Sequence, residues 1–142
     1  MIFLDASILV AALVDIEPFH KPCARLLLGD KPKWVRSHVL VETFSTLTGG
    51  RLSLRLSATT ATRLIEVNLL PRLKFVELTP GAVVTALKES EGRGIRGGAI
   101  HDYLHLAAAR KAKVETLYTL NLSHFRAFYR PGDPEVRLPG SN

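Results

Sequence analysis

Residues 2–10 read IFLDASILV, and the order of residue types in this stretch decides the fold. The three apolar residues Ile2–Leu4 predict a short buried strand that stops at the charged Asp5. The apolar run over residues 6–14 predicts a helix. Asp5 lies between the two elements, where a carboxylate can cap the helix and stabilise it by about 1 kcal/mol. This arrangement carries Asp5 to the carboxyl end of a strand.

Strands and helices alternate along the rest of the chain. Strand patterns cover residues 34–37, 73–78, 115–120 and 136–138, and helical patterns cover residues 18–29, 38–48, 57–70, 80–91, 99–113 and 124–128. This alternation predicts an α/β sandwich built on a parallel sheet. Because there is no repeat, linker or low-complexity tract, we expect residues 1–142 to form a single domain.

The composition is that of a globular protein with a basic surface. Hydrophobic residues make up 46% of the chain, the net charge is +6 and the isoelectric point is about 9.8, which favours binding to polyanions such as nucleic acids. The single cysteine excludes an internal disulfide and a cysteine-rich zinc site, and a reducing cytoplasm is the expected location. No apolar run reaches the roughly 20 residues that span a bilayer, so a soluble protein without a membrane partner is predicted.

Two motifs match known signatures only formally. Residues 92–97 fit the dinucleotide pattern G-x-G-x-x-G, but a helix end rather than a strand is predicted before them. His101 and His105 lie four residues apart on one predicted helix and resemble the zinc-binding pattern H-E-x-x-H with Asp102 in place of Glu. A zinc hydrolase that uses this histidine pair is therefore an alternative function, although the sequence supplies no obvious third ligand.

Four polar residues could hold a metal ion, namely Asp5, Glu42, Asp102 and Asn121. Each also has a structural explanation. Asp5 can be an N-cap, Asp102 suits the first turn of its helix, and Asn121 can form a turn after a strand. Glu42 lies opposite the apolar face that Leu40, Val41, Phe44 and Leu47 would form, which favours an exposed surface residue.

The predicted positions favour a common site. Asp5 and Asn121 both follow strands, and Asp102 opens a helix at the same edge of the sheet if its connection is right-handed. Ligands of open α/β sheets bind at this edge. A cluster of carboxylates there needs a cation, and oxygen ligands suit Mg²⁺ or Mn²⁺ better than zinc.

Four segments together resemble the PIN-domain family of nucleases. Residues 2–10 resemble its first motif, with Asp5 and then Ser7 in the expected places, and residues 37–42 (SHVLVE) resemble the segment that supplies its glutamate. Residues 100–109 (IHDYLHLAAA) resemble the third motif, which begins at an aspartate. Residues 118–125 (YTLNLSHF) resemble the last motif, in which Asn121 replaces the more common aspartate. The resemblance extends from Ile2 to about Leu138.

The length and single-domain build most resemble the VapC toxins within this family. The resemblance implies a three-layer α/β/α sandwich with a five-stranded, mostly parallel central sheet, and a site for Mg²⁺ or Mn²⁺ at Asp5, Asp102 and Glu42. It implies endoribonuclease activity on RNA, with Asn121 as an outer orienting group and Thr119 as a supporting one. It also implies a homodimer and a cognate antitoxin, for which residues 18–28 and 58–70 could form a groove. Because Asn121 carries no charge, one tightly held ion is expected rather than two.

Five further residues are candidate contacts to the substrate, namely Ser7, Arg93, Arg96, Arg126 and Arg130. For each arginine, a solvated surface position is an equally good interpretation. A second alternative function follows from Asn121: a nucleic-acid-binding PIN module that has kept the fold but lost catalysis.

Overall fold

A computed structural model describes residues 1–50, 52 and 55–140 of the chain. In this part, five parallel strands form one sheet in the order β3-β2-β1-β4-β5. The strands are β1 (Ile2–Leu4), β2 (Lys33–Val35), β3 (Leu73–Phe75), β4 (Thr116–Tyr118) and β5 (Glu135–Arg137). The predicted parallel sheet is confirmed, and β1 lies at its centre.

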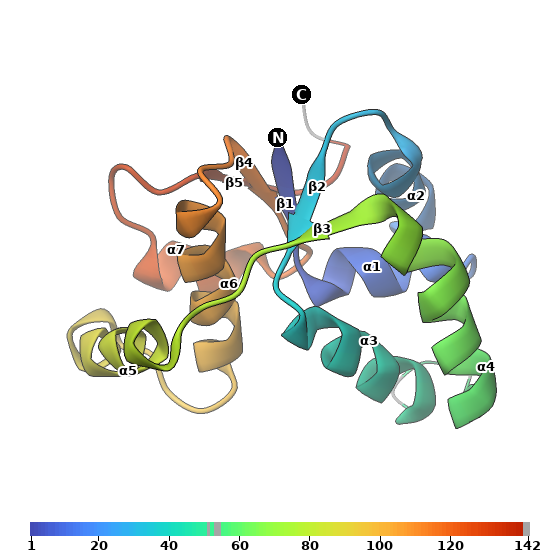
Figure 1. The fold of residues 1–142 in the computed structure, drawn as a ribbon, viewed down its shortest axis with the longest axis horizontal. Coiled ribbons are helices and arrows are strands. Elements are labelled where there is room, and N and C mark those ends of the chain that lie inside the picture. Colours follow the sequence, from blue (N-terminus) through green and yellow to red (C-terminus); the bar gives the residue numbers. More distant parts are fainter. Residues whose placement is uncertain (51, 53–54, 141–142) are drawn as a thin grey trace.

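Helices cover both faces of the sheet, so the molecule has the predicted three layers (Figure 1). One side carries α1 (Ala6–Leu13), α2 (His20–Leu28), α3 (His38–Thr48) and α4 (Ala58–Leu64), and the other carries α5 (Pro80–Glu89), α6 (Ala99–Lys111) and α7 (Leu122–Phe128).

The alternation of side chains along β1 divides the core into two layers. Ile2 and Leu4 pack with α1, α2 and α3, whereas Phe3 packs with α5, α6 and α7 on the opposite face. All three side chains are buried. A continuous apolar run is therefore needed for this central strand, because helices cover it on both sides.

Local sequence signals explain where several helices begin. Asp5 caps α1 by accepting a hydrogen bond from the backbone N–H of Ile8, and Ser57 caps α4 in the same way. Thr79 caps α5, and Pro80 occupies the first helical position, where its missing N–H has no consequence. The predicted start at Pro80 is confirmed.

Some predicted boundaries differ from the observed ones. Helix α2 begins at His20, two residues after the predicted start, and every strand is only three residues long. The helix predicted over 57–70 is α4 followed by a π-helical turn (Ile65–Leu69) and a 3-10 turn (Leu70–Arg72). Pro71 lies in this last turn, where the absence of an N–H prevents a regular helix from continuing.

The apolar face of α3 also differs from its prediction. Val39, Thr43 and Leu47 are its fully buried residues, and Leu40 and Phe44 are partly buried. Val41 is 60% exposed, so its predicted place on the buried face is wrong. The fully buried residues follow one another at intervals of four positions, and Val41 lies away from that stripe; α3 contacts both α1 and α4.

Candidate active site

Two neighbouring strands bring Asp5 and Asn121 to the same edge of the sheet. Asp5 follows β1, Asn121 comes shortly after β4, and the two strands pair in parallel. The backbone N–H of Asp5 donates to the carbonyl of Tyr118 at 3.3 Å, which extends this pairing by one step. The predicted placement at the carboxyl ends of the strands is therefore what the structure shows.

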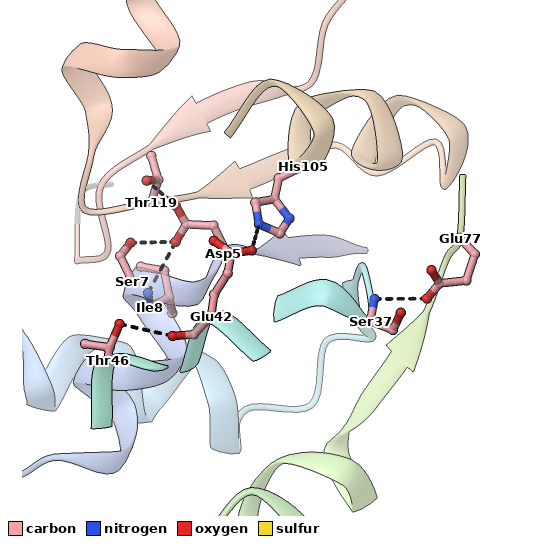
Figure 2. Close-up of polar contacts among 9 residues, drawn as sticks. All are labelled: Asp5, Ser7, Ile8, Ser37, Glu42, Thr46, Glu77, His105 and Thr119. Carbon is pink, nitrogen blue, oxygen red and sulfur yellow. Dashed lines mark hydrogen bonds and ion pairs between the residues drawn. The ribbon is translucent and has the colours of Figure 1, made fainter. Parts of the chain in front are cut away.

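The carboxylate of Asp5 is buried and accepts three hydrogen bonds (Figure 2). Oδ1 accepts from the hydroxyl of Ser7 at 2.5 Å and from the N–H of Ile8 at 3.3 Å. Oδ2 accepts from the hydroxyl of Thr119 at 2.5 Å. The N-cap role of Asp5 thus uses one bond, and two side-chain hydroxyls hold the carboxylate in a fixed orientation.

The same two hydroxyls connect the loop after β4 to the start of α1. Ser7 Oγ accepts from the backbone N–H of Leu120, and Thr119 Oγ1 accepts from the backbone N–H of Asn121, both at 2.9 Å. Ser7, which we proposed as a substrate contact, therefore has a positioning role in this structure. The supporting role predicted for Thr119 agrees with its direct contact to Asp5.

Electrostatic coupling links Asp5 to residues of α6. Burial raises the pKa of Asp5 above its usual value, and the hydrogen bonds from Ser7 and Thr119 oppose this increase. The charge of His105 lowers the pKa, and the charge of Asp102 raises it. These interactions place Asp102 and His105 near Asp5, so α6 brings the second predicted aspartate to the site.

Glu42 contacts His105 across the site instead of facing solvent. Nε2 of His105 donates to Oε1 of Glu42 at 2.6 Å, and the Glu42 side chain is only 24% exposed (Figure 2). Burial favours a higher pKa for Glu42, but the bond from His105 and the charges of His38 and His101 lower it below its usual value. The exposed position that helical periodicity favoured is therefore wrong, because α6 packs over that side of α3.

Asp102 and Asn121 complete the set of predicted site residues. Asp102 Oδ2 accepts a hydrogen bond from Nδ1 of His124 at 2.7 Å, which joins α6 to α7. Asn121 is exposed, and it lines an open pocket of about 340 Å³ together with Ser7 and Glu42. The other lining residues are Ala6, Val10, Glu17, Thr46, Leu52 and Leu120.

Comparison with known proteins assigns this arrangement to a family. The family model described as PIN domain matches residues 2–130, which covers every residue of the candidate site. The chain belongs to the PIN-domain family. A comparison with curated proteins gives no match.

Solved structures agree with this assignment at the level of the fold. VapC20 from Mycobacterium tuberculosis, described as a sarcin-ricin loop cleaving toxin, superposes with a TM-score of 0.73 at 19% identity, over 94% of this chain and 100% of its own. The VapBC2 complex from Rickettsia felis, bound to a promoter DNA fragment, gives 0.67 at 20% identity, over 98% and 99%. A toxin-antitoxin complex from Klebsiella pneumoniae gives 0.64 at 16% identity, with full coverage of both chains. The predicted PIN-like α/β fold is confirmed.

Two carboxylates of this PIN domain, Asp5 and Asp102, supply oxygen donors of the kind that a hard divalent cation prefers. Asp5 and Asp102 are close enough for their charges to interact, and the described donors to Asp5 are two neutral hydroxyls and a backbone N–H, which do not cancel its charge. Among the described residues, no group of three or more His, Cys, Asp or Glu side chains is arranged to hold a metal ion. Glu42 is bound to His105 and Asp102 to His124, so each acid has its own partner.

The two histidines of the zinc alternative have different surroundings. His105 is fully buried, lies 6.1 Å from the ring of Phe3 and is bonded to Glu42. His101 is exposed and stacks on His38. His105 thus has a carboxylate partner and His101 a ring partner, and the zinc hydrolase stays an alternative prediction. The rejected dinucleotide motif is preceded by α5, not by a strand.

Two of the four arginines proposed as substrate contacts have partners within the protein, and the other two are exposed. Arg93 donates through Nη1 to the carbonyl of Phe128 at 3.1 Å and lies over the ring of Tyr103. Arg130 donates to the carbonyl of the preceding residue at 2.9 Å. Arg96 and Arg126 are exposed. A structural role for Arg93 could not be predicted from local sequence, because its partner lies 35 positions away.

Sequence reasoning missed three histidines as partners of the acids. His105 and His124 bind Glu42 and Asp102, and His38 lies near Glu42. One signal was available for His105, which follows Asp102 by one helical turn and therefore lies on the same side of α6.

Among the described residues, no helix is long and apolar enough to cross a membrane.

Proposed function

We propose that this PIN domain is an endoribonuclease that depends on Mg²⁺ or Mn²⁺ and hydrolyses RNA phosphodiester bonds. One observation carries the proposal: the carboxylate of Asp5 is buried at the strand edge where α/β proteins bind ligands, and the charge of Asp102 on α6 raises its pKa. The family assignment and the net charge of +6 also support a nucleic-acid substrate.

We assign Asp5 and Asp102 as direct ligands of one ion. Glu42 is a ligand directly or through water, and Asn121 is an outer orienting group. When bound, a divalent ion offsets the charge that develops on a phosphodiester and lowers the pKa of water. By analogy with the family, cleavage leaves 5′-phosphate and 3′-hydroxyl ends.

The residues of the chain have separate tasks in this proposal. Ser7 and Thr119 fix both oxygens of Asp5, so that the carboxylate needs no reorientation when it binds a ligand. His105 holds Glu42 ionised and directed across the site, because its hydrogen bond lowers the pKa of that carboxyl. An ionised Glu42 can accept a proton from an attacking water, which is the base role that we propose for it.

The test is cleavage of RNA by purified protein with Mg²⁺ or Mn²⁺, compared with EDTA. We expect Asp5→Asn and Asp102→Asn to reduce cleavage by at least about 100-fold, which is on the order of the loss when one group that stabilises a transition state electrostatically is removed. Asp15→Asn is the matched control, since Asp15 is exposed just beyond α1. Undiminished cleavage by Asp5→Asn would remove that residue from the mechanism.

We further propose that the protein is the toxin of a toxin–antitoxin pair and forms a homodimer. The toxin assignment is supported by the likeness in fold to a sarcin-ricin loop cleaving toxin and to two toxin–antitoxin complexes. The homodimer is what the family resemblance implies. Apolar side chains on the segments 18–28 and 58–70 remain exposed and could contact an antitoxin arm, among them Phe19, Leu28, Val67 and Leu70.

Expression in bacteria tests this second proposal. We expect production of the wild-type protein to stop growth, and co-production of the product of a neighbouring gene to restore it. The Asp5→Asn variant is the control, because it should be harmless at the same protein level. Harmless production of an RNA-cleaving wild-type protein would contradict the toxin assignment and leave the nuclease assignment intact.

A non-catalytic nucleic-acid-binding PIN module is the second candidate function. The exposed Asn121 favours it, because an amide adds no negative charge to the site. Binding of RNA without cleavage in the presence of either metal would support this alternative. Asn121→Asp then provides a direct test, since a restored acid should create metal-dependent cleavage if charge is what the site lacks.

A further inference from the structure

Two histidine rings form a stack beside the candidate active site. His38 is the first residue of α3 and His101 is the third residue of α6, so the stack joins the first turns of two helices. The ring centroids are 5.2 Å apart and the ring planes differ by 12°. His101 is exposed and His38 is partly buried.

Hydrogen bonds among the described residues do not account for the stack. In the described part of the chain, neither imidazole ring makes a hydrogen bond, whereas the rings of His20, His105 and His124 each do. Two polar rings that are held face to face without such bonds present an aromatic surface. The exposed position of His101 leaves this surface accessible from solvent.

The stack lies close to the acids of the site. His38 lies one helical turn before Glu42 on α3, and His101 directly precedes Asp102 on α6. The charges of both histidines act on Glu42. A group bound on the stack would therefore be a near neighbour of the phosphodiester that the site cleaves.

The charges around the stack favour an uncharged ligand. Arg36 is positive, and its Nε and Nη2 atoms are buried without a hydrogen-bond partner among the described residues, but Glu42 and Glu77 both lie near it. Glu77 also accepts from the backbone N–H of Ser37 at the start of α3 (Figure 2). Mixed charge of this kind gives a phosphate no clear advantage, whereas a neutral aromatic ring can bind by stacking.

We propose that the His38–His101 stack is a nucleobase subsite, in which an unpaired RNA base next to the cleaved phosphodiester stacks on His101. Aromatic side chains, histidine included, bind single-stranded RNA bases in this way. The subsite accepts any base, because stacking does not read hydrogen-bonding edges. This inference rests on the proposed ribonuclease function and adds a contact to a base beside the cleaved bond.

The test is RNA binding by the full chain in EDTA, which separates binding from cleavage. Short single-stranded RNAs carry the fluorescent base 2-aminopurine at successive positions. We expect quenching by the wild-type protein at one position, and loss of this quenching in His101→Ala. Affinity should fall roughly 5-fold to 100-fold, which corresponds to the loss of one stacked base.

Two further variants decide between stacking and other roles of the histidine. His101→Phe keeps an aromatic face but removes both ring nitrogens, so it should retain the quenching and most of the affinity. Phe19→Ala, which removes an exposed aromatic ring outside the site, should bind RNA like the wild type.

The remaining outcomes distinguish failure of the stacking proposal from failure of the nuclease proposal. Equal weakening by His101→Ala and His101→Phe would overturn the proposal, because the imidazole would then act through charge, hydrogen bonding or a metal. Wild-type affinity in His101→Ala would also overturn it, while RNA cleavage would continue to support the nuclease function. Failure of the wild-type protein to bind or cleave any RNA would contradict both proposals.

Discussion

The hydroxyl of Thr119 donates a hydrogen bond to Oδ2 of Asp5 at 2.5 Å, although the two residues lie 114 positions apart in the chain. The same hydroxyl accepts from the backbone N–H of Asn121. One buried side chain therefore fixes a predicted metal ligand and the loop that carries Asn121. Because of this double role, we expect replacement of Thr119 to lower stability more than replacement of a threonine in a strand usually does.

Replacement of Thr119 by valine should therefore destabilise the protein. The change leaves a buried carboxylate oxygen and a backbone N–H without their partner, and we expect the free energy of unfolding to fall by about 1–3 kcal/mol. RNA cleavage should also decrease. Urea unfolding followed by circular dichroism measures the first effect.

Thr43→Val is the matched control for this prediction. Thr43 is also fully buried, but its hydroxyl has no hydrogen-bond partner among the described residues. Its replacement should be neutral or stabilising by about 1 kcal/mol, because an unpaired buried hydroxyl is unfavourable. Equal destabilisation by both variants would show that the contact to Asp5 has no special importance.

The raised pKa of Asp5 predicts how stability depends on pH. Burial disfavours the charged carboxylate in the folded state, so ionised Asp5 lowers the free energy of unfolding at any pH above its folded pKa. This penalty becomes smaller as the pH falls below the folded pKa, and it is lost once the pH is below the unfolded pKa of 3.8. Asp5→Asn removes the penalty. The stability of this variant relative to wild type should therefore be greatest near pH 7 and decrease on acidification. A pH-independent difference in urea unfolding would contradict the assignment.

Bound divalent metal should make the wild type more stable than the Asp5→Asn variant. An ion that binds only the folded state at 100 times its dissociation constant adds about 2.7 kcal/mol of stability. For a domain of this size, that corresponds to an increase of roughly 5–10 °C in Tm. We expect Mn²⁺ to raise the Tm of the wild type and of Asp15→Asn, but not that of Asp5→Asn. A uniform increase in all three would indicate binding elsewhere.

The single cysteine should be unreactive in the folded protein. Burial, together with the nearby charge of Asp5, raises the pKa of the Cys23 thiol to about 12. Since the thiolate is the reactive form, modification by Ellman's reagent at pH 8 should be at least about 100-fold slower than in urea. Rapid modification of the native protein would show that α2 opens readily.

Two neighbouring arginines should respond differently to replacement by alanine. Arg93→Ala removes the bond to the Phe128 carbonyl and the contact with the Tyr103 ring, so we expect a loss of about 1–2 kcal/mol in stability. Arg96→Ala should change stability by less than about 0.5 kcal/mol. It should instead weaken RNA binding and reduce its dependence on salt, as expected for a phosphate contact. Unchanged RNA binding would remove Arg96 from the substrate contacts.

The sequence was sufficient to predict the layers of the fold and the position of Asp5. A strand, an acid and a helix follow one another within residues 2–13, and each of these signals is local. The exact match of α3 to its predicted bounds has the same origin, since Gly49 and Gly50 follow it directly. Local signals suffice where the structure depends on residues close in sequence.

Contacts between distant helices could not be predicted in this way. Periodicity places Glu42 on the polar side of α3 but does not reveal that His105, 63 positions later, covers that side. The bond from Arg93 to Phe128 is a similar case. The geometry of the site depends on how α6 packs against α3 and α7, and that packing is a property of the whole chain.

The central position of β1 has a consequence for biosynthesis. This strand pairs with β4, and the carboxylate that follows it is held by a hydroxyl that the ribosome adds more than a hundred residues later. A nascent chain that contains only the first half of the sheet cannot have a complete reaction centre. Under the proposed ribonuclease function, cleavage therefore requires that β4 and Thr119 have been synthesised and have folded against β1.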